Sequence, residues 1–226
     1  DFPIIGPVAG QLCYQTARLI GAQRVYELGS GYGYSTAWFA RAVQENCADA
    51  GAGVVFVACG MGGGTGSGAA PVVAEIARNA GALTVAVVTR PFSFEGAYRQ
   101  RVAQESLDII KGKVDSLISI SNDKLLAALN PDTTLANAFW LCDEVLRQAV
   151  QSISDLVLSP GIINVDFADV RSILKDSGRA IFGIGRARGE KRAEIAARAA
   201  MESPLFDAPA RGAKGLLFNV SGGLDI

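Results

Sequence analysis

The sequence contains no histidine among its 226 residues. Histidine is the usual general base of hydrolytic triads and a frequent metal ligand, so its absence excludes both roles, and we assign no metal ligands among the side chains. Cysteine is scarce as well: the four cysteines show no C-x-x-C spacing of the kind found in metal or redox sites. Their apolar or helical settings predict buried free thiols in a reducing cytoplasm.

Charge and long apolar runs are also limited. The formal net charge is −1 and no basic block is present, which argues against nucleic-acid binding by bulk electrostatics. No apolar run approaches the ~18 residues of a transmembrane helix, and no signal peptide is recognisable. Half of the residues are apolar, enough for a sizeable core in one large domain or two small ones. The chain starts at Asp1 and stops at Ile226 just after a strand-like run, which suggests a fragment or an engineered chain.

Glycine is present in excess. Residues 60–68 read GMGGGTGSG, with a strand-like stretch before them and a helix-like stretch after. Glycine lets backbone N–H groups approach an anion closely, and the amino end of the following helix adds partial positive charge. A tight turn is the alternative interpretation, but it would not need this many glycines. We therefore predict a phosphate-binding loop.

The glycine run fits neither common phosphate motif. Ala69 and Ala70 stand where a lysine-type P-loop has Lys and Ser or Thr. Residues 64–69 match a dinucleotide fingerprint only loosely, because Arg90 follows the next strand where an acid would hold a ribose.

Strand-like and helix-like segments alternate through the first half of the chain. The predicted strands cover residues 24–28, 54–58, 83–89 and 116–120, with a turn at 121–123. The predicted helices cover residues 10–20, 35–43, about 69–80 and 99–110. The alternation predicts an α/β fold, a Rossmann-like parallel sheet with helices on both faces, with its strands in chain order.

A long helix is predicted over residues 135–158, where apolar residues recur every three or four positions. It would span about 35 Å and could cross a whole domain. Helices near 167–175 and 190–201 and strands at 180–184 and 215–220 follow it. They predict a partial second α+β domain.

Four motifs in order resemble the FtsZ family, the bacterial and archaeal tubulin-like GTPases of cell division. They are the glycine run, TVAVVTRPFSFEG at 84–96, NDKLL at 122–126 and NVDFADVR at 164–171. The resemblance covers about residues 50–226. It implies a shortened tubulin-like GTPase domain that binds GTP or GDP with Mg²⁺.

The resemblance also implies the roles of individual residues at the nucleotide. The glycine run would hold the phosphates, Glu95 the ribose and Arg99 the phosphate side. Asn122 and Asp143 would read guanine, whose adjacent N–H donors suit one carboxylate, with Phe139 packed on the base. The binding set is Gly62, Gly63, Gly64, Thr65, Gly66, Ser67, Gly68, Glu95, Arg99, Asn122, Phe139 and Asp143. Taken singly, Phe139 also fits a core position, Asp143 a solvated helix face and Arg99 a surface charge.

Asn164, Asp166 and Asp169 form the catalytic set that the resemblance implies. Without it, Asp166 and Asp169 would be assigned as helix caps. In FtsZ-like proteins this loop positions the attacking water at the GTP of the next subunit. The resemblance therefore implies head-to-tail self-association into a filament.

The first 46 residues are instead similar to S-adenosylmethionine-dependent O-methyltransferases. The turn ELGSGYGYST at 27–36 carries this resemblance, but the ribose-binding acid expected on the next strand is missing. The alternative is that this segment only supplies a strand, a turn and a helix. We therefore expect a chimera: residues 1–46 complete the sheet, residues 47–158 form the nucleotide-binding domain with the central helix, and residues 159–226 hold the catalytic loop and a truncated C-terminal domain.

The leading hypothesis is a cytoplasmic FtsZ-like GTP-binding protein, whose hydrolysis and polymerisation are weakened by the replaced amino terminus. Two alternatives stay open. One is an S-adenosylmethionine-binding module or methyltransferase, and the other is a non-catalytic scaffold made from two nucleotide-binding folds.

Overall fold

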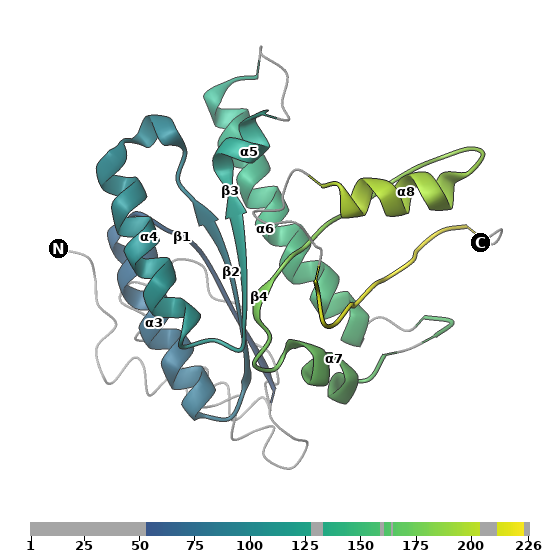
Figure 1. Cartoon of the computed structure of the whole chain (residues 1–226), viewed down its shortest axis with the longest axis horizontal. Helices are drawn as coiled ribbons and strands as arrows, with labels where there is room; N and C mark the ends of the chain where they lie inside the picture. The colour runs from purple at the N-terminus through teal and green to yellow at the C-terminus, as the bar shows by residue number, and fades with distance from the viewer. Residues whose placement is uncertain (1–52, 128–132, 159–160, 164, 204–211, 224–226) are drawn as a thin grey trace, which may run out of the picture.

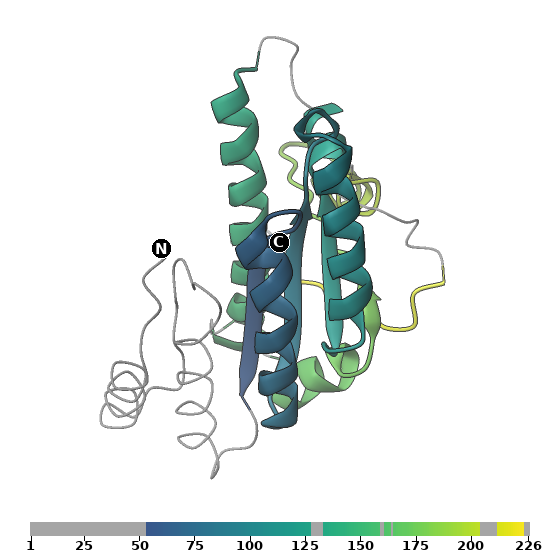
Figure 2. The same ribbon diagram turned by 90° about the vertical axis from the view of Figure 1, so that its left-hand side faces the viewer.

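The computed structural model describes residues 53–127, 133–158, 161–163, 165–203 and 212–223. Within them a four-stranded parallel sheet has the order β1-β2-β3-β4 and carries helices on both faces (Figures 1 and 2). The elements are β1 (Val54–Gly60), α3 (Gly64–Asn79), β2 (Leu83–Arg90), η1 (Ser93–Glu95), α4 (Ala97–Lys111), β3 (Ser116–Ser121), α5 (Asn122–Ala127), α6 (Leu135–Leu158), α7 (Phe167–Leu174), β4 (Gly178–Ala180) and α8 (Arg192–Met201). The α/β class and the chain order of the strands at 54, 83 and 116 are confirmed. The predicted strand at 24–28 and its flanking helices lie outside the described residues.

The central strand β2 is buried on both faces, as is typical of a parallel sheet covered by helices. Val85 and Val87 belong to one apolar cluster, whereas Ala86 and Val88 belong to another. Successive side chains of a strand point to opposite faces, so the two clusters lie on opposite sides of the sheet. Helix α6 covers the first, and helices α3 and α4 cover the second.

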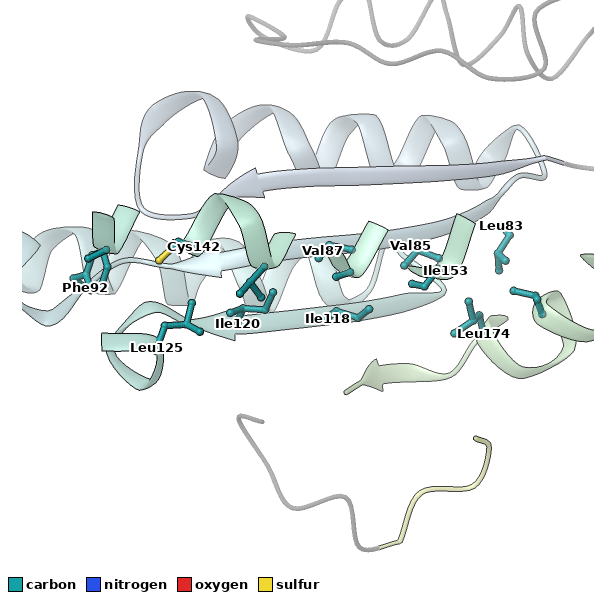
Figure 3. Close-up of a cluster of buried hydrophobic side chains, with 14 residues drawn as sticks. Leu83, Val85, Val87, Phe92, Ile118, Ile120, Leu125, Cys142, Ile153 and Leu174 are labelled. Carbon is teal, nitrogen blue, oxygen red and sulfur yellow. The ribbon is translucent and has the colours of Figure 1, made fainter. Parts of the chain in front are cut away.

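Helix α6 runs along the whole length of β2. It has 24 residues and therefore extends over about 36 Å. Figure 3 shows Cys142 near Phe92 at one end of the cluster and Ile153 near Leu174 at the other. The α6 residues buried in this cluster recur at helical spacing: Ala138, Cys142, Val145, Ala149 and Ile153. Within the described residues, no helix combines the length and apolar character that a membrane span needs.

The fourth strand corrects the prediction for residues 180–184. β4 is shorter and begins earlier, at Gly178, and it pairs with β3 of the main sheet. The Gly178 N–H donates to the backbone oxygen of Asp115 at 2.9 Å, which starts this pairing. Residues 181–184 continue without strand structure.

The strand predicted at 215–220 is also wrong. Residues 212–223 form no strand in the structure. Leu217 packs against the α6-side cluster, but Leu216, Phe218 and Val220 are exposed. Alternating apolar residues form a strand only where a neighbouring strand pairs with their backbone groups, and the described residues provide no such neighbouring strand here.

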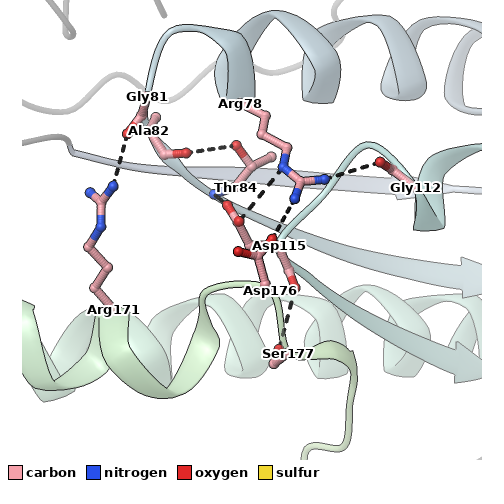
Figure 4. Close-up of polar contacts among 9 residues, drawn as sticks. All are labelled: Arg78, Gly81, Ala82, Thr84, Gly112, Asp115, Arg171, Asp176 and Ser177. Carbon is pink, nitrogen blue, oxygen red and sulfur yellow. Dashed lines mark hydrogen bonds and ion pairs between the residues drawn. The ribbon is translucent and has the colours of Figure 1, made fainter.

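A polar clamp fastens the amino ends of the strands (Figure 4). Asp115 is 4% exposed; its Oδ2 accepts the Thr84 N–H at 2.8 Å, and its own N–H donates to the Thr84 oxygen at 2.9 Å. Arg78 of α3 lies 3.8 Å from the Asp115 carboxylate and pairs with Asp176, which follows α7. The clamp therefore joins α3, β2, β3 and the turn before β4.

Asp115→Ala tests the clamp. It leaves the buried Thr84 N–H unpaired and is expected to lower the free energy of unfolding by about 2 kcal/mol, measured by denaturant unfolding followed by circular dichroism. Asp108→Ala is the matched control, because that exposed carboxylate accepts a surface hydrogen bond from Gln104 and lies away from the clamp. Equal stability of the two variants would contradict the role assigned to Asp115.

Candidate nucleotide site

The amino end of α3 forms an open cradle at the carboxyl end of β1. Gly63 occupies the N-cap position without a side-chain hydrogen bond, and the first turn carries no acidic residue. A Cβ added at Gly63, Gly64 or Gly68 would meet no atom of the described residues within 4 Å. The N–H groups of the first turn and the positive end of the helix dipole are therefore accessible to an anion.

Two glycines of the run are required by packing. A Cβ at Gly66 would lie 2.1 Å from the Gly60 oxygen, so α3 can rest on the end of β1 only without one. Gly62 has φ +99°, and a Cβ there would lie 2.9 Å from the Arg99 oxygen. Its N–H donates to Ser67 Oγ at 2.9 Å, which closes the turn. The run thus combines close packing at 62 and 66 with open space at 63, 64 and 68.

Glu95 and Arg99 lie together in the segment that follows β2. Glu95 Oε1 accepts the Phe92 N–H at 2.8 Å, and Oε2 lies 2.6 Å from Arg99 Nη1. The Glu95 side chain is 13% exposed and that of Arg99 57%. A carboxylate oxygen has two lone pairs, so each Glu95 oxygen retains one for a further donor.

Asn122 is the first residue of α5, directly after β3, rather than part of the predicted turn. It is 5% exposed, and its Oδ1 has no hydrogen-bond partner in the part of the chain that the structure describes. A buried, unsatisfied amide oxygen is costly in a folded protein. A ligand group or water at the carboxyl edge of the sheet would relieve that cost.

The first turns of α6 bring Phe139 and Asp143 to the same region. Phe139 is 41% exposed and meets the buried Phe92 edge to face at 5.1 Å. Asp143, one turn further along, is exposed. The pKa of the neighbouring Cys142 thiol is raised to about 11, first by burial and then by the carboxylates of Asp143 and Glu95. Both acids therefore lie within electrostatic range of one buried thiol.

The predicted catalytic loop lies at the other end of the sheet, beside the amino ends of the strands. Asp166 caps α7, its Oδ1 accepting the Asp169 N–H at 2.9 Å, and both residues are exposed. Arg171 of α7 donates to the Gly81 oxygen, before the start of β2, whereas the glycine run meets the end of β2 through the Met61 N–H bond to Thr89. The strand between them spans about 25 Å. The structure therefore does not bring Asp166 and Asp169 to the cradle, and Asn164 lies outside the described residues (Figure 1).

Asp123 is a further residue of the site that the sequence motifs did not indicate. Its Oδ1 accepts the Ser93 N–H at 2.8 Å and so ties the end of β3 to the turn that carries Glu95. An acid directly after a strand, beside a residue already assigned to the site, was the available signal.

Comparison with known proteins identifies the family. Residues 11–130, more than half of the chain, match the model of the Tubulin/FtsZ family GTPase domain. The chain belongs to this family. Residues 178–226 match the model of the FtsZ family C-terminal domain.

Individual relatives agree with this assignment. The chain is 45% identical over 224 residues to cell division protein FtsZ 1 of Rhizobium meliloti (strain 1021), covering 94% of this chain and 38% of the relative. A mutant FtsZ of M. jannaschii superposes with a TM-score of 0.68 at 44% identity, covering 80% of this chain and 55% of the other. An empty FtsZ dimer of M. jannaschii gives 0.66 at 43% identity, covering 80% and 53%. The chain thus spans less than half of the curated relative and just over half of each solved structure.

The same comparisons bear on the amino-terminal segment. The match to the GTPase domain starts at residue 11 and so takes in most of residues 1–46, which were compared above with methyltransferases. The comparisons give no support to a methyltransferase segment or to a chimera. The turn at 27–36 lies outside the described residues.

Gly66→Ala and Gly68→Ala test the division of roles within the glycine run. Gly66→Ala is expected to lower the free energy of unfolding by about 2 kcal/mol or more, because its Cβ overlaps a backbone oxygen. Gly68→Ala, with open space around it, should preserve or raise stability, since alanine favours helix by up to about 1 kcal/mol over glycine. Denaturant unfolding of both variants measures this, and equal losses would contradict the packing role of Gly66.

Proposed function

We propose that this chain binds GTP or GDP at the carboxyl edge of its sheet, and that it hydrolyses GTP together with a second copy. Cell division in the cytoplasm is the proposed setting. The observation that carries the binding proposal is the uncapped amino end of α3 on the same sheet edge as the unpartnered Asn122 oxygen. The first suits a phosphate chain, and the second suits a polar base.

Guanine specificity would come from α5 and α6. The exposed carboxylate of Asp143 can accept both the N1–H and the N2–H of guanine, a donor pair that adenine lacks. Asn122 adds an amide from the next element, and Phe139 offers a partly exposed ring for the base to pack on.

The ribose and phosphates would extend from the base toward the cradle. Glu95 retains two acceptor lone pairs, one for each vicinal hydroxyl of a ribose. Arg99 is more exposed than Glu95 and can turn toward a phosphate without losing buried contacts. Mg²⁺ would neutralise charge on the transferring phosphate, and it would be held mainly by the phosphates, since it usually takes few protein ligands in such sites.

Hydrolysis would be completed between subunits. A strand about 25 Å long separates the acidic loop from the cradle of its own chain, so its carboxylates would act on nucleotide held by a neighbour. Asp166, Asp169 and Asn164 are the residues proposed to position the attacking water. Ile162 and Ile163, beside them, are 101% and 88% exposed, as suits residues covered by another subunit. Contact between opposite ends of identical chains is head-to-tail and gives a filament.

The two alternatives have less support. S-adenosylmethionine binding depends on residues 27–35, which lie outside the described residues. A scaffold without ligands does not account for the buried Asn122 oxygen.

GTP selectivity is the first test. The chain is expected to bind GTP–Mg²⁺ more tightly than ATP–Mg²⁺, and Asp143→Asn should weaken GTP binding by about tenfold, because the amide replaces one acceptor oxygen with a donor. Calorimetry measures both affinities, with Asp108→Asn as the control on an exposed part of α4. Equal affinity for GTP and ATP, or no binding of either, would overturn the proposal.

Subunit mixing tests hydrolysis in trans. Asp169→Asn removes one of the two loop carboxylates but keeps the backbone N–H that Asp166 caps, and Asp143→Arg blocks guanine at an exposed position. Each variant alone should be inactive, whereas a 1:1 mixture should regain about a quarter of wild-type phosphate release, since one random head-to-tail interface in about four joins a competent site to a competent loop. A mixture as inactive as its components would contradict action between subunits.

A further inference from the structure

We propose that Asp123 is a positioning residue for the ribose end of the nucleotide site, acting through Glu95. The inference rests on the proposed binding of GTP and extends it. Asp123 would fix the short turn that presents the Glu95 carboxylate, and so set how well the site distinguishes a ribonucleotide from a deoxyribonucleotide.

The turn that carries Glu95 is held from several directions. Within the turn, Glu95 Oε1 accepts the Phe92 N–H at 2.8 Å. From α4, Gln100 Nε2 donates to the Pro91 oxygen at 3.0 Å. From the far side, Asp123 Oδ1 accepts the Ser93 N–H at 2.8 Å, across a separation of 30 residues. The Asp123 bond therefore fixes this turn relative to β3.

The hydrogen bond between Asp123 and Ser93 is formed at the first N–H of the turn, where a carboxylate acceptor stabilises the turn most strongly. Ser93 is the first residue of the 3-10 turn Ser93–Glu95, so its N–H lacks a partner within the turn. A charged acceptor makes a shorter and stronger hydrogen bond to such an N–H than a neutral one. Phe92, just before it, is fully buried and stacked on Phe94 at 4.8 Å. The turn is thus fixed at its start by packing and by charge.

Asp123 also links the two ends of the proposed nucleoside site. Its neighbour Asn122 is the buried amide assigned to the base, and both residues begin α5. Asn122 would therefore contact the base itself, and Asp123 would fix the position of the Glu95 carboxylate through its hydrogen bond with Ser93. Loss of the Asp123 contact would let the Glu95 turn shift relative to Asn122 while leaving the phosphate cradle on α3 unchanged.

This arrangement makes the expected effect selective for the ribose. Glu95 has one lone pair free on each oxygen, because Phe92 and Arg99 occupy the others. Two vicinal hydroxyls can use both lone pairs only if the carboxylate is correctly placed. A misplaced turn would therefore cost a ribonucleotide two hydrogen bonds and a deoxynucleotide, which lacks one of the hydroxyls, only one.

The test compares GTP with 2′-deoxy-GTP and 3′-deoxy-GTP, each with Mg²⁺, on the 226-residue chain. The wild type should prefer GTP by about tenfold over either deoxynucleotide. Asp123→Ala should weaken GTP more than either deoxynucleotide, so that the affinities for the three nucleotides become similar. Asp123→Asn keeps an acceptor oxygen for the Ser93 N–H and should retain most of the discrimination. Asp108→Ala, an acid on the exposed side of α4, is the matched control.

A double-mutant cycle shows whether Asp123 acts through Glu95. In a Glu95→Ala background, Asp123→Ala should cause no further loss of ribose discrimination. Three results would overturn the inference: an equal loss for all three nucleotides in Asp123→Ala, full discrimination in that variant, or additive effects in the cycle. Failure of the wild type to bind GTP would instead overturn the proposed function, and the inference with it.

Discussion

The structure depends on one close approach, that of α3 to the end of β1 at Gly66. A Cβ at this position would overlap the Gly60 oxygen, so its absence lets the helix begin directly above the strand. The same approach directs the first-turn N–H groups of α3 away from the sheet and into open space. It also lets α3 cover β1 and β2 with small buried residues such as Ala74 and Ala77. The proposed phosphate site and the packing on this face of the sheet therefore depend on the same close approach.

The central helix α6 connects the carboxyl end of the sheet to its amino end. Its start carries Phe139 and Asp143 beside the turn after β2, and its buried stripe continues to Ile153 near α7. Because α6 packs along β2, the region of Phe139 and the region of α7 are held a fixed distance apart. In the proposed function, the nucleotide site and the acidic loop lie at opposite ends of the chain and would meet only between two copies.

Local sequence patterns predicted much of this fold and the position of the glycine run between a strand and a helix. The buried runs of β2 and β3 and the helical spacing of α6 are strong local signals, and these elements were predicted close to their observed bounds. The pairing of β4 with β3 was not predicted, because it depends on a hydrogen bond from Gly178 to the distant Asp115. At the site, the glycine run indicated an anion, but only three-dimensional contacts separate Gly66 from Gly68. The Asp123 contact with Ser93 joins residues 30 positions apart and left no periodic trace in the sequence.

The late return of β4 has a consequence for how the sheet forms. Val54 pairs with Leu83, and Val85 with Ser116, so the first three strands assemble through consecutive strand–helix units. Ser116 pairs with Gly178 only after α6 and α7 have been made. The connection between these two strands is about twice as long as the earlier ones, and each doubling of loop length costs only about 0.6 kcal/mol at equilibrium. The delay is therefore kinetic rather than energetic. During synthesis, the free edge of β3 stays open until the chain has passed residue 180, and in that interval it can pair with another nascent chain.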